Sequence, residues 1–300
     1  MIRGVRLMGF GMIVFITVIL IAVLYLCAVR AFRFAHPDRH PVLGTPTDYA
    51  FSHWRDVTLI TSDNLKLSAW FILPETPIAK NPAILFVHGI AGNRLQFVEK
   101  AQWLTQQGYA VLLFDLHNHG NSEGTLTTMG LREVNDVKAA FTYLAAQPEI
   151  DPDSITLYGH SMGGVTAILA MAELPQIKAL IVDTAYTSLI DVINDGVQNV
   201  IGTPFILGDV IMLMTGVLTG ENLYAIRPID VIATIAPRLI YMMHGTNDPT
   251  IPVSHAAALY EKAHDPKFLW LVEGGVHGNL YDIAPDEYQA RVLPFLSSTP

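Results

Sequence analysis

The chain has 300 residues, of which 27 are acidic and 18 are basic, and its formal net charge is −9. This charge argues against a nucleic-acid partner, because no basic stripe is present to neutralise phosphates. Hydrophobic residues make up 51% of the chain and charged residues 15%, which is more apolar than an ordinary soluble protein. The single cysteine, Cys27, excludes an intramolecular disulfide, so cysteine content does not indicate a redox compartment.

The first element is an uncharged run of 23 residues from Leu7 to Val29, with two arginines before it and Arg30 and Arg33 after it. A bilayer core about 30 Å thick needs roughly 20 helical residues, so the run is long enough to span. A signal peptide has a shorter apolar region of about 7–15 residues. We therefore expect an uncleaved anchor over residues 1–35, although small residues near its end also suit cleavage. The flanking basic residues are nearly balanced, and we favour a catalytic domain outside the cytoplasm.

The rest of the chain predicts a linker and one α/β domain. Residues 36–53 are rich in Pro and His and lack periodicity, which is typical of a linker, and the domain is expected over 54–298. Continuous apolar runs without a period of two predict a mostly parallel sheet with helices on both faces. The expected strands are 57–61, 65–73, 83–88, 110–115, 155–159, 178–183, 238–244 and 267–272, and the expected helices are 94–107, 131–146, 162–173, 252–263 and 284–297.

Residues 187–230 interrupt this alternation. Their centre, residues 200–220, is an apolar stretch of 21 residues with one charge, Asp209, and its length would suit a second membrane span. However, Pro204 and several glycines weaken a continuous helix, and Asp209 would cost about 2.5–3.5 kcal/mol to insert. A span here would also separate the candidate catalytic residues described next. We interpret the block as an inserted cap, or lid, that contacts the bilayer or an apolar substrate.

The sequence Gly159-His160-Ser161-Met162-Gly163 matches G-x-S-x-G between an apolar strand and a helix. In such a turn the serine is held in a strained conformation above the sheet, and Gly159 and Gly163 allow the backbone to fold tightly. The following helix offers free backbone N–H groups at its N-terminus. This context predicts that Ser161 is a nucleophile.

A serine hydroxyl needs a base to accept its proton and an acid to orient that base. In this type of sheet the partners follow the serine in the order acid, then histidine. Asp248 follows a predicted strand end, and His277 lies in a glycine-flanked loop after the next strand. Both positions lie at the carboxyl edge of the sheet, where open α/β sheets place their sites. We therefore expect a catalytic set of Ser161, Asp248 and His277.

Other residues compete for these two roles. Asp183 ends the strand after the nucleophile helix and is the main alternative acid, whereas Glu273 is read as a carboxylate at a loop end. His244 and His255 are the alternative bases. We expect backbone groups to satisfy His244 at the end of its strand, and His255 to lie in the helix after Asp248.

The oxyanion hole is expected to combine the Met162 amide with one from the loop 88–93. The loop reads His-Gly-Ile-Ala-Gly-Asn, and its small residues let the backbone turn its amides towards a substrate carbonyl. Ile90 is the preferred donor and Ala91 the next. We expect His88 to support the loop by a hydrogen bond rather than to act as a base.

Five segments, HGIAGN, DLHNHGNSEG, GHSMGG, HGTNDPTIP and GGVHGN, occur in this order. Together they resemble the α/β-hydrolase superfamily, especially its serine aminopeptidase-like and prolyl-oligopeptidase-like branches, which include membrane-anchored lipid hydrolases. The resemblance covers roughly residues 55–296, and implies a triad of Ser161, Asp248 and His277 with 187–230 as the cap. There is one departure, because Asn118 stands where many relatives carry an arginine. That substitution puts the anchoring salt bridge of this loop in doubt.

These observations predict a membrane-anchored serine hydrolase that cleaves carboxylic esters, preferably lipophilic ones, through an acyl-enzyme on Ser161. Amide or peptide hydrolysis by the same triad is the alternative within enzymes, and a non-catalytic binding protein on this fold is the alternative outside them. The sequence contains no H-E-x-x-H motif, paired cysteines or phosphate-binding loop, so we expect no metal ion or organic cofactor. The expected partners are an ester substrate and the membrane.

Overall fold

The computed structural model describes residues 2–201 and 206–298. Its strands are β1 (Trp54–Ile60), β2 (Lys66–Ile72), β3 (Asn81–Val87), β4 (Ala110–Phe114), β5 (Ile150–His160), β6 (Ala179–Asp183), β7 (Leu239–Gly245) and β8 (Lys267–Val272). The α-helices are α1 (Ile2–Ala35), α2 (Val98–Gln106), α3 (Glu133–Ala145), α4 (Met162–Glu173), α5 (Leu189–Ile201), α6 (Ile206–Thr219), α7 (Pro228–Val231), α8 (Val253–Lys262), α9 (Leu280–Ile283) and α10 (Pro285–Ser297). Short 3-10 helices lie at Pro46–Tyr49, Arg94–Phe97, Leu223–Ala225 and Ile232–Ile235.

The eight strands form one sheet in the order β1-β2-β4-β3-β5-β6-β7-β8. The strands from β4 to β8 in this order pair in parallel, and β1 and β2 form an antiparallel edge. Because parallel strands end at the same edge, the loops after β3, β5, β7 and β8 share one side of the molecule. The predicted α/β fold is confirmed. The main difference is β5, which begins at Ile150 although its first residues are polar.

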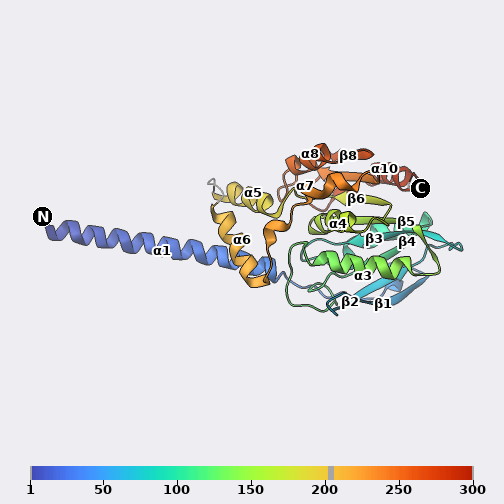
Figure 1. The fold of residues 1–300 in the computed structure, drawn as a ribbon, viewed down its shortest axis with the longest axis horizontal. Coiled ribbons are helices and arrows are strands. Elements are labelled where there is room, and N and C mark those ends of the chain that lie inside the picture. The colour runs from blue at the N-terminus through green and yellow to red at the C-terminus, as the bar shows by residue number, and fades with distance from the viewer. Residues whose placement is uncertain (1, 202–205, 299–300) are drawn as a thin grey trace.

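Helices cover both faces of the sheet and create two apolar cores (Figure 1). On one face α3, α4 and α8 pack on alternate strand residues such as Leu85 and Leu157. On the other face aromatic residues of α2 and α10, including Trp103 and Phe295, pack on Phe86 and its neighbours. Strands buried on both faces need apolar side chains at every position, which explains their continuous apolar sequences.

Helix α1 extends far beyond the globular part of the molecule (Figure 1). Its segment Phe10–Ala35 is long and apolar enough to cross a membrane, and its length, composition and position also suit a signal sequence. Its last turns belong to the globular part, because Cys27, Ala31 and Ala35 are buried. The amide of Thr127 donates a hydrogen bond of 2.8 Å to the carbonyl of Ala35 at the helix end.

The predicted linker lies against the loop that follows β4. Arg39 Nε donates to the Gly120 carbonyl at 2.8 Å, and the Val42 amide donates to Asn121 Oδ1 at 3.1 Å. Asn93 Nδ2 also donates to the carbonyl of His40 at 2.9 Å. Through these contacts the segment between α1 and β1 holds the end of α1 close to the carboxyl edge of the sheet.

The block 187–230 contains α5, α6 and α7, and α6 packs along the end of α1 (Figure 1). Helix α6 has 14 residues, which is shorter than the roughly 20 that a span requires. Tyr224 donates a hydrogen bond of 2.7 Å to Asp209 Oδ1, so this carboxylate has a polar partner within the cap. The breaks expected at Gly202 and Pro204 fall outside the described residues.

Candidate active site

Ser161 lies in a sharp turn between β5 and α4. Its φ of 55° and ψ of −121° place it in a strained region that is common at functional sites. The turn is held from beneath, because the Ser161 amide donates to the carbonyls of Thr184 at 2.8 Å and Asp183 at 3.0 Å. A Cβ on Gly159 would lie 2.3 Å from the Gly163 carbonyl oxygen. The predicted turn is therefore present, and only glycine fits at position 159.

Three side chains from separate loops meet above the end of β5. The Ser161 hydroxyl is 3.0 Å from His277 Nε2, and His277 Nδ1 is 2.8 Å from Asp248 Oδ2. Asp248 comes from the loop after β7 and His277 from the loop after β8. With Nδ1 protonated, His277 donates to Asp248 and accepts from Ser161. The structure thus brings together the three residues that the sequence indicated, across 116 positions of the chain.

Asp248 is fixed so that one carboxylate oxygen remains for His277. Its Oδ1 accepts hydrogen bonds from the amides of Thr250 at 2.7 Å and Ile251 at 2.9 Å. Burial alone would raise the pKa of Asp248, but the hydrogen bond from His277 and those from the backbone outweigh it and hold the pKa below its usual value. The carboxylate is therefore ionised at neutral pH and orients the imidazole.

Asp183, the alternative acid, faces other residues. Its Oδ2 accepts a hydrogen bond of 3.1 Å from the Tyr158 hydroxyl, and its Oδ1 lies 3.4 Å from His160 Nδ1. Burial would raise the pKa of Asp183, but the adjacent His160 lowers it to about 2. The His160 ring in turn packs at 5.0 Å from the His277 ring, measured between centroids. Asp183 thus lies behind the histidine that supports His277.

The other candidates occupy structural positions. His244 Nε2 donates to the Ile251 carbonyl at 2.9 Å, and His255 Nε2 donates to Asp195 at 2.7 Å. Glu273 is exposed. His88 is buried between the two loops, where its Nδ1 donates to the Gly89 carbonyl at 2.7 Å and its Nε2 accepts from the Leu116 amide at 3.0 Å. Burial lowers the pKa of His88 to about 3, so its ring is neutral and supports the loop as expected.

The two predicted oxyanion donors line the same pocket as Ser161. Met162 is the first residue of α4, where a backbone N–H has no partner within the helix. In the described part of the chain, neither the Met162 amide nor the Ile90 amide donates a hydrogen bond. Ala91 has a φ of 56° and turns the loop immediately after Ile90. Both amides are therefore free to receive a developing negative charge.

Comparisons with known proteins agree with this geometry. The family model described as serine aminopeptidase, S33, matches residues 79–194. The alpha/beta hydrolase domain-containing protein WAV2 of Arabidopsis thaliana is 30% identical over 251 residues, which cover 81% of this chain and 78% of that protein. The chain belongs to the α/β-hydrolase superfamily. The uncharacterized protein YfhR of Escherichia coli K12 is 28% identical over 247 residues, 81% of this chain and 80% of YfhR.

The chain is similar in structure to solved esterases. An esterase of Pyrococcus furiosus superposes with a TM-score of 0.73 and 26% identity, covering 88% of this chain and 97% of the esterase. The esterase domain of a Rhodothermus marinus protein superposes with a TM-score of 0.57 and 25% identity, over 80% of this chain and 96% of that domain. The family and these neighbours support a hydrolase.

In this α/β-hydrolase the loop after β4 is anchored by a residue that sequence reasoning missed. Arg94 forms a buried ion pair with Asp115, with 2.7 Å between Nη2 and Oδ2. Its backbone amide also donates to Asp115 Oδ1 at 2.8 Å. Asn118, which replaces the arginine of many relatives, instead donates to Thr127 Oγ1 at 3.1 Å. The salt bridge that Asn118 put in doubt is thus formed by Arg94, whose partner lies 21 positions away.

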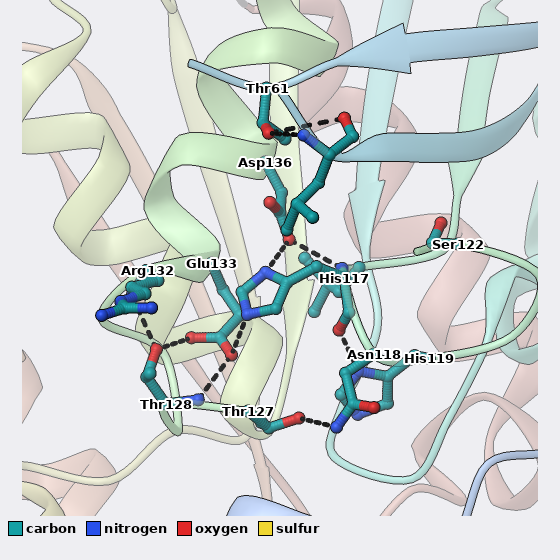
Figure 2. A network of polar contacts seen from close by, with 12 residues as sticks. Thr61, His117, Asn118, His119, Ser122, Thr127, Thr128, Arg132, Glu133 and Asp136 are labelled. Carbon is teal, nitrogen blue, oxygen red and sulfur yellow. Dashed lines mark hydrogen bonds and ion pairs between the residues drawn. The ribbon is translucent and has the colours of Figure 1, made fainter. Parts of the chain in front are cut away.

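A second buried network joins this loop to α3 (Figure 2). His117 Nδ1 lies 2.7 Å from Asp136 Oδ2, and its Nε2 lies 3.3 Å from Glu133 Oε1. Burial by itself would lower the pKa of His117, but the two carboxylates outweigh burial and raise the pKa to about 9. Glu133 also accepts hydrogen bonds from the Thr128 and Gly130 amides. The network therefore fixes the loop that binds the end of α1.

The pocket at Ser161 has a volume of about 570 Å³, within the usual range for small-molecule sites. Its walls are mainly apolar side chains from α5, α6 and the loop 249–251, together with Arg30 and Phe34 of α1. A larger hollow of about 770 Å³ near Glu75 and Glu99 contains none of the candidate catalytic residues. The hydrogen-bonded set of Ser161, His277 and Asp248 thus lies at the apolar pocket.

Proposed function

We propose that this α/β-hydrolase is a membrane-anchored serine hydrolase that cleaves carboxylic esters of lipophilic molecules through an acyl-enzyme on Ser161. The observation that carries the proposal is the continuous chain of hydrogen bonds from Ser161 through His277 to Asp248, at the base of an apolar pocket. A serine paired with a base that is itself oriented by a carboxylate is the arrangement required for nucleophilic catalysis.

The geometry supports a two-step acyl transfer. Ser161 Oγ attacks the ester carbonyl carbon and His277 Nε2 takes the hydroxyl proton, while Asp248 stabilises the imidazolium. The Met162 and Ile90 amides donate to the oxyanion of the tetrahedral intermediate. When the intermediate collapses, the C–O bond to the alcohol breaks and His277 returns the proton to the departing alkoxide. Water, deprotonated by His277, then attacks the acyl-enzyme and releases the carboxylic acid and free Ser161.

The pocket favours an ester with an apolar acyl group over an aminopeptidase substrate. An aminopeptidase must bind the protonated amino terminus of a peptide, for which a carboxylate in the pocket is the natural partner. Among the described residues that line the pocket, the charged side chain is the cation Arg30. The apolar walls from α5 and α6 instead suit a hydrocarbon chain.

The anchor role of α1 is supported by the packing of its last turns. A signal sequence is removed from the mature protein, but cleavage after Ala31, where the small residues lie, would remove the buried residues Cys27 and Ala31 and take Arg30 from the pocket. We therefore infer that α1 stays attached. Intact mass measurement of the protein extracted from membranes should give the uncleaved chain, and a mass that lacks residues 1–31 would contradict this inference.

Turnover by the purified full-length chain tests the ester proposal. A series of p-nitrophenyl esters of increasing acyl length should be hydrolysed with a kcat/KM that rises with length, whereas aminoacyl p-nitroanilides should be poor substrates. Ser161→Ala should abolish ester turnover, and Ser154→Ala, at a serine of the strand that precedes Ser161, should leave it unchanged. Faster turnover of the anilides than of every ester would favour the amide alternative.

A further inference from the structure

Arg30 connects the anchor to the substrate pocket. It lies in the last turns of α1 and lines the same pocket as Ser161, together with Phe34 one turn further on. Its guanidinium carbon lies 4.8 Å from the centre of the Phe34 ring. Within residues 2–201 and 206–298, no carboxylate forms an ion pair with Arg30. An arginine without an anionic partner thus faces an otherwise uncharged pocket.

The acidic residues of the cap helix α5, which also lines the pocket, form hydrogen bonds with other residues. On α5, Asp195 lies 2.7 Å from His255 Nε2, and Asp191 accepts a hydrogen bond of 2.9 Å from the Thr187 hydroxyl. Neither side chain lines the pocket. A guanidinium presents five donors in a planar fork that matches a phosphate or a carboxylate. An anionic group at the mouth of the pocket would therefore meet a free and well-matched cation.

The surroundings of Arg30 place this mouth next to the membrane. Helix α6 packs along the end of α1 and presents an apolar outer side, on which Leu213 is 66% and Val217 is 77% exposed. Such a row of exposed apolar residues beside a membrane helix suits a helix that lies in the lipid interface. Exposed apolar residues therefore lie on both α1 and α6, and both helices contribute residues to the pocket together with α5. An amphiphile in the bilayer can therefore enter from the side.

We propose that Arg30 is a specificity-determining residue that binds the anionic head group of a membrane amphiphile, while the acyl chain of that molecule lies in the apolar pocket. The proposal rests on the ester hydrolase function proposed above and names its substrate class, an anionic acyl ester such as an acylglycerol phosphate. Ser161 would then cleave the ester bond between a hydrocarbon chain in the pocket and a head group held by the anchor helix.

Binding of uncleavable lipids tests Arg30 without depending on hydrolysis. In full-length Ser161→Ala protein in neutral detergent, we would measure binding of a fluorescent 1-O-alkylglycerol 3-phosphate and of the matching uncharged 1-O-alkylglycerol. The charged probe should bind about tenfold more tightly, since a charge-assisted hydrogen bond contributes about 1.5 kcal/mol or more. Arg30→Gln should remove this preference and leave binding of the uncharged probe unchanged. Arg30→Lys should keep part of the preference.

Arg33, another exposed arginine on the same helix that does not line the pocket, is the matched control. Arg33→Gln should retain the full preference for the charged probe. An undiminished preference in Arg30→Gln, or an equal loss in Arg33→Gln, would overturn the proposal in favour of general surface charge, and so would failure of both probes to bind. Wild-type protein that binds the charged probe but hydrolyses no ester would instead refute the proposed function and leave the Arg30 site in place.

Discussion

Replacement of His117 by Gln should remove a large proton-linked contribution to folding. His117 has a side chain only 6% exposed, between Asp136 and Glu133, and its pKa is raised to about 9 from about 6.5 in the unfolded chain. A pKa raised in the folded state gives stability that is fully present below about pH 6.5 and is lost as the pH rises through about 9. The rise corresponds to about 3 kcal/mol, or about 6–12 °C in Tm for a domain of this size.

Thermal unfolding of the full-length protein in detergent, followed by tryptophan fluorescence at a fixed scan rate, measures this effect. Wild-type Tm should fall between pH 6.5 and pH 9.5, whereas the Tm of His117→Gln should be lower at pH 6.5 and nearly flat across the range. His264→Gln, at an exposed histidine, should behave as wild type. If His117→Gln kept the wild-type pH dependence, the ion-paired arrangement in Figure 2 would be refuted.

Two further predictions concern the catalytic loops. Asp248→Asn should lower kcat on a p-nitrophenyl ester about 10⁴-fold by disturbing the histidine tautomer, and Asp183→Asn should lower it less than tenfold; the reverse ranking in steady-state kinetics would identify Asp183 as the acid. Gly163→Ala should prevent folding, because its Cβ would lie 2.1 Å from the Val87 carbonyl oxygen, whereas Gly196→Ala, with no atom within 4 Å, should fold normally. Circular dichroism and gel filtration of both glycine variants would measure folding. A folded Gly163→Ala protein would contradict the claim that the turn has no room for a Cβ.

The fold was predictable because its signals are local. Each core strand is a continuous apolar run, and each expected strand and helix is present with ends that shift by a few residues. The polar start of β5 was missed because Asp151 and Asp153 have low strand propensity, yet this strand forms from Ile150. Ile150 pairs with Asn81 of β3 and Ile155 with Ala83, so the polar residues between them lie at an irregularity in the pairing.

The candidate site was predictable as far as chain order and spacing define it. Ser161, Asp248 and His277 follow motif-bearing loops at strand ends, and the parallel sheet brings those ends together. The buried ion pair between Arg94 and Asp115 was not predictable, because no motif or spacing in the sequence links the two residues. The role of Arg30 was not predictable either, because in the sequence it only follows the membrane segment. The packing of α1 on α6 places it in the pocket.

The most direct test of the central claim is to find which residue reacts. Full-length protein treated with a fluorophosphonate should carry one adduct, located by peptide mass spectrometry on Ser161, and His277→Ala should slow its formation strongly. Ser154→Ala should label as wild type, and Ser161→Ala should not label. An adduct on a different serine, or ester turnover by Ser161→Ala at the wild-type rate, would contradict the assignment of Ser161 as the nucleophile.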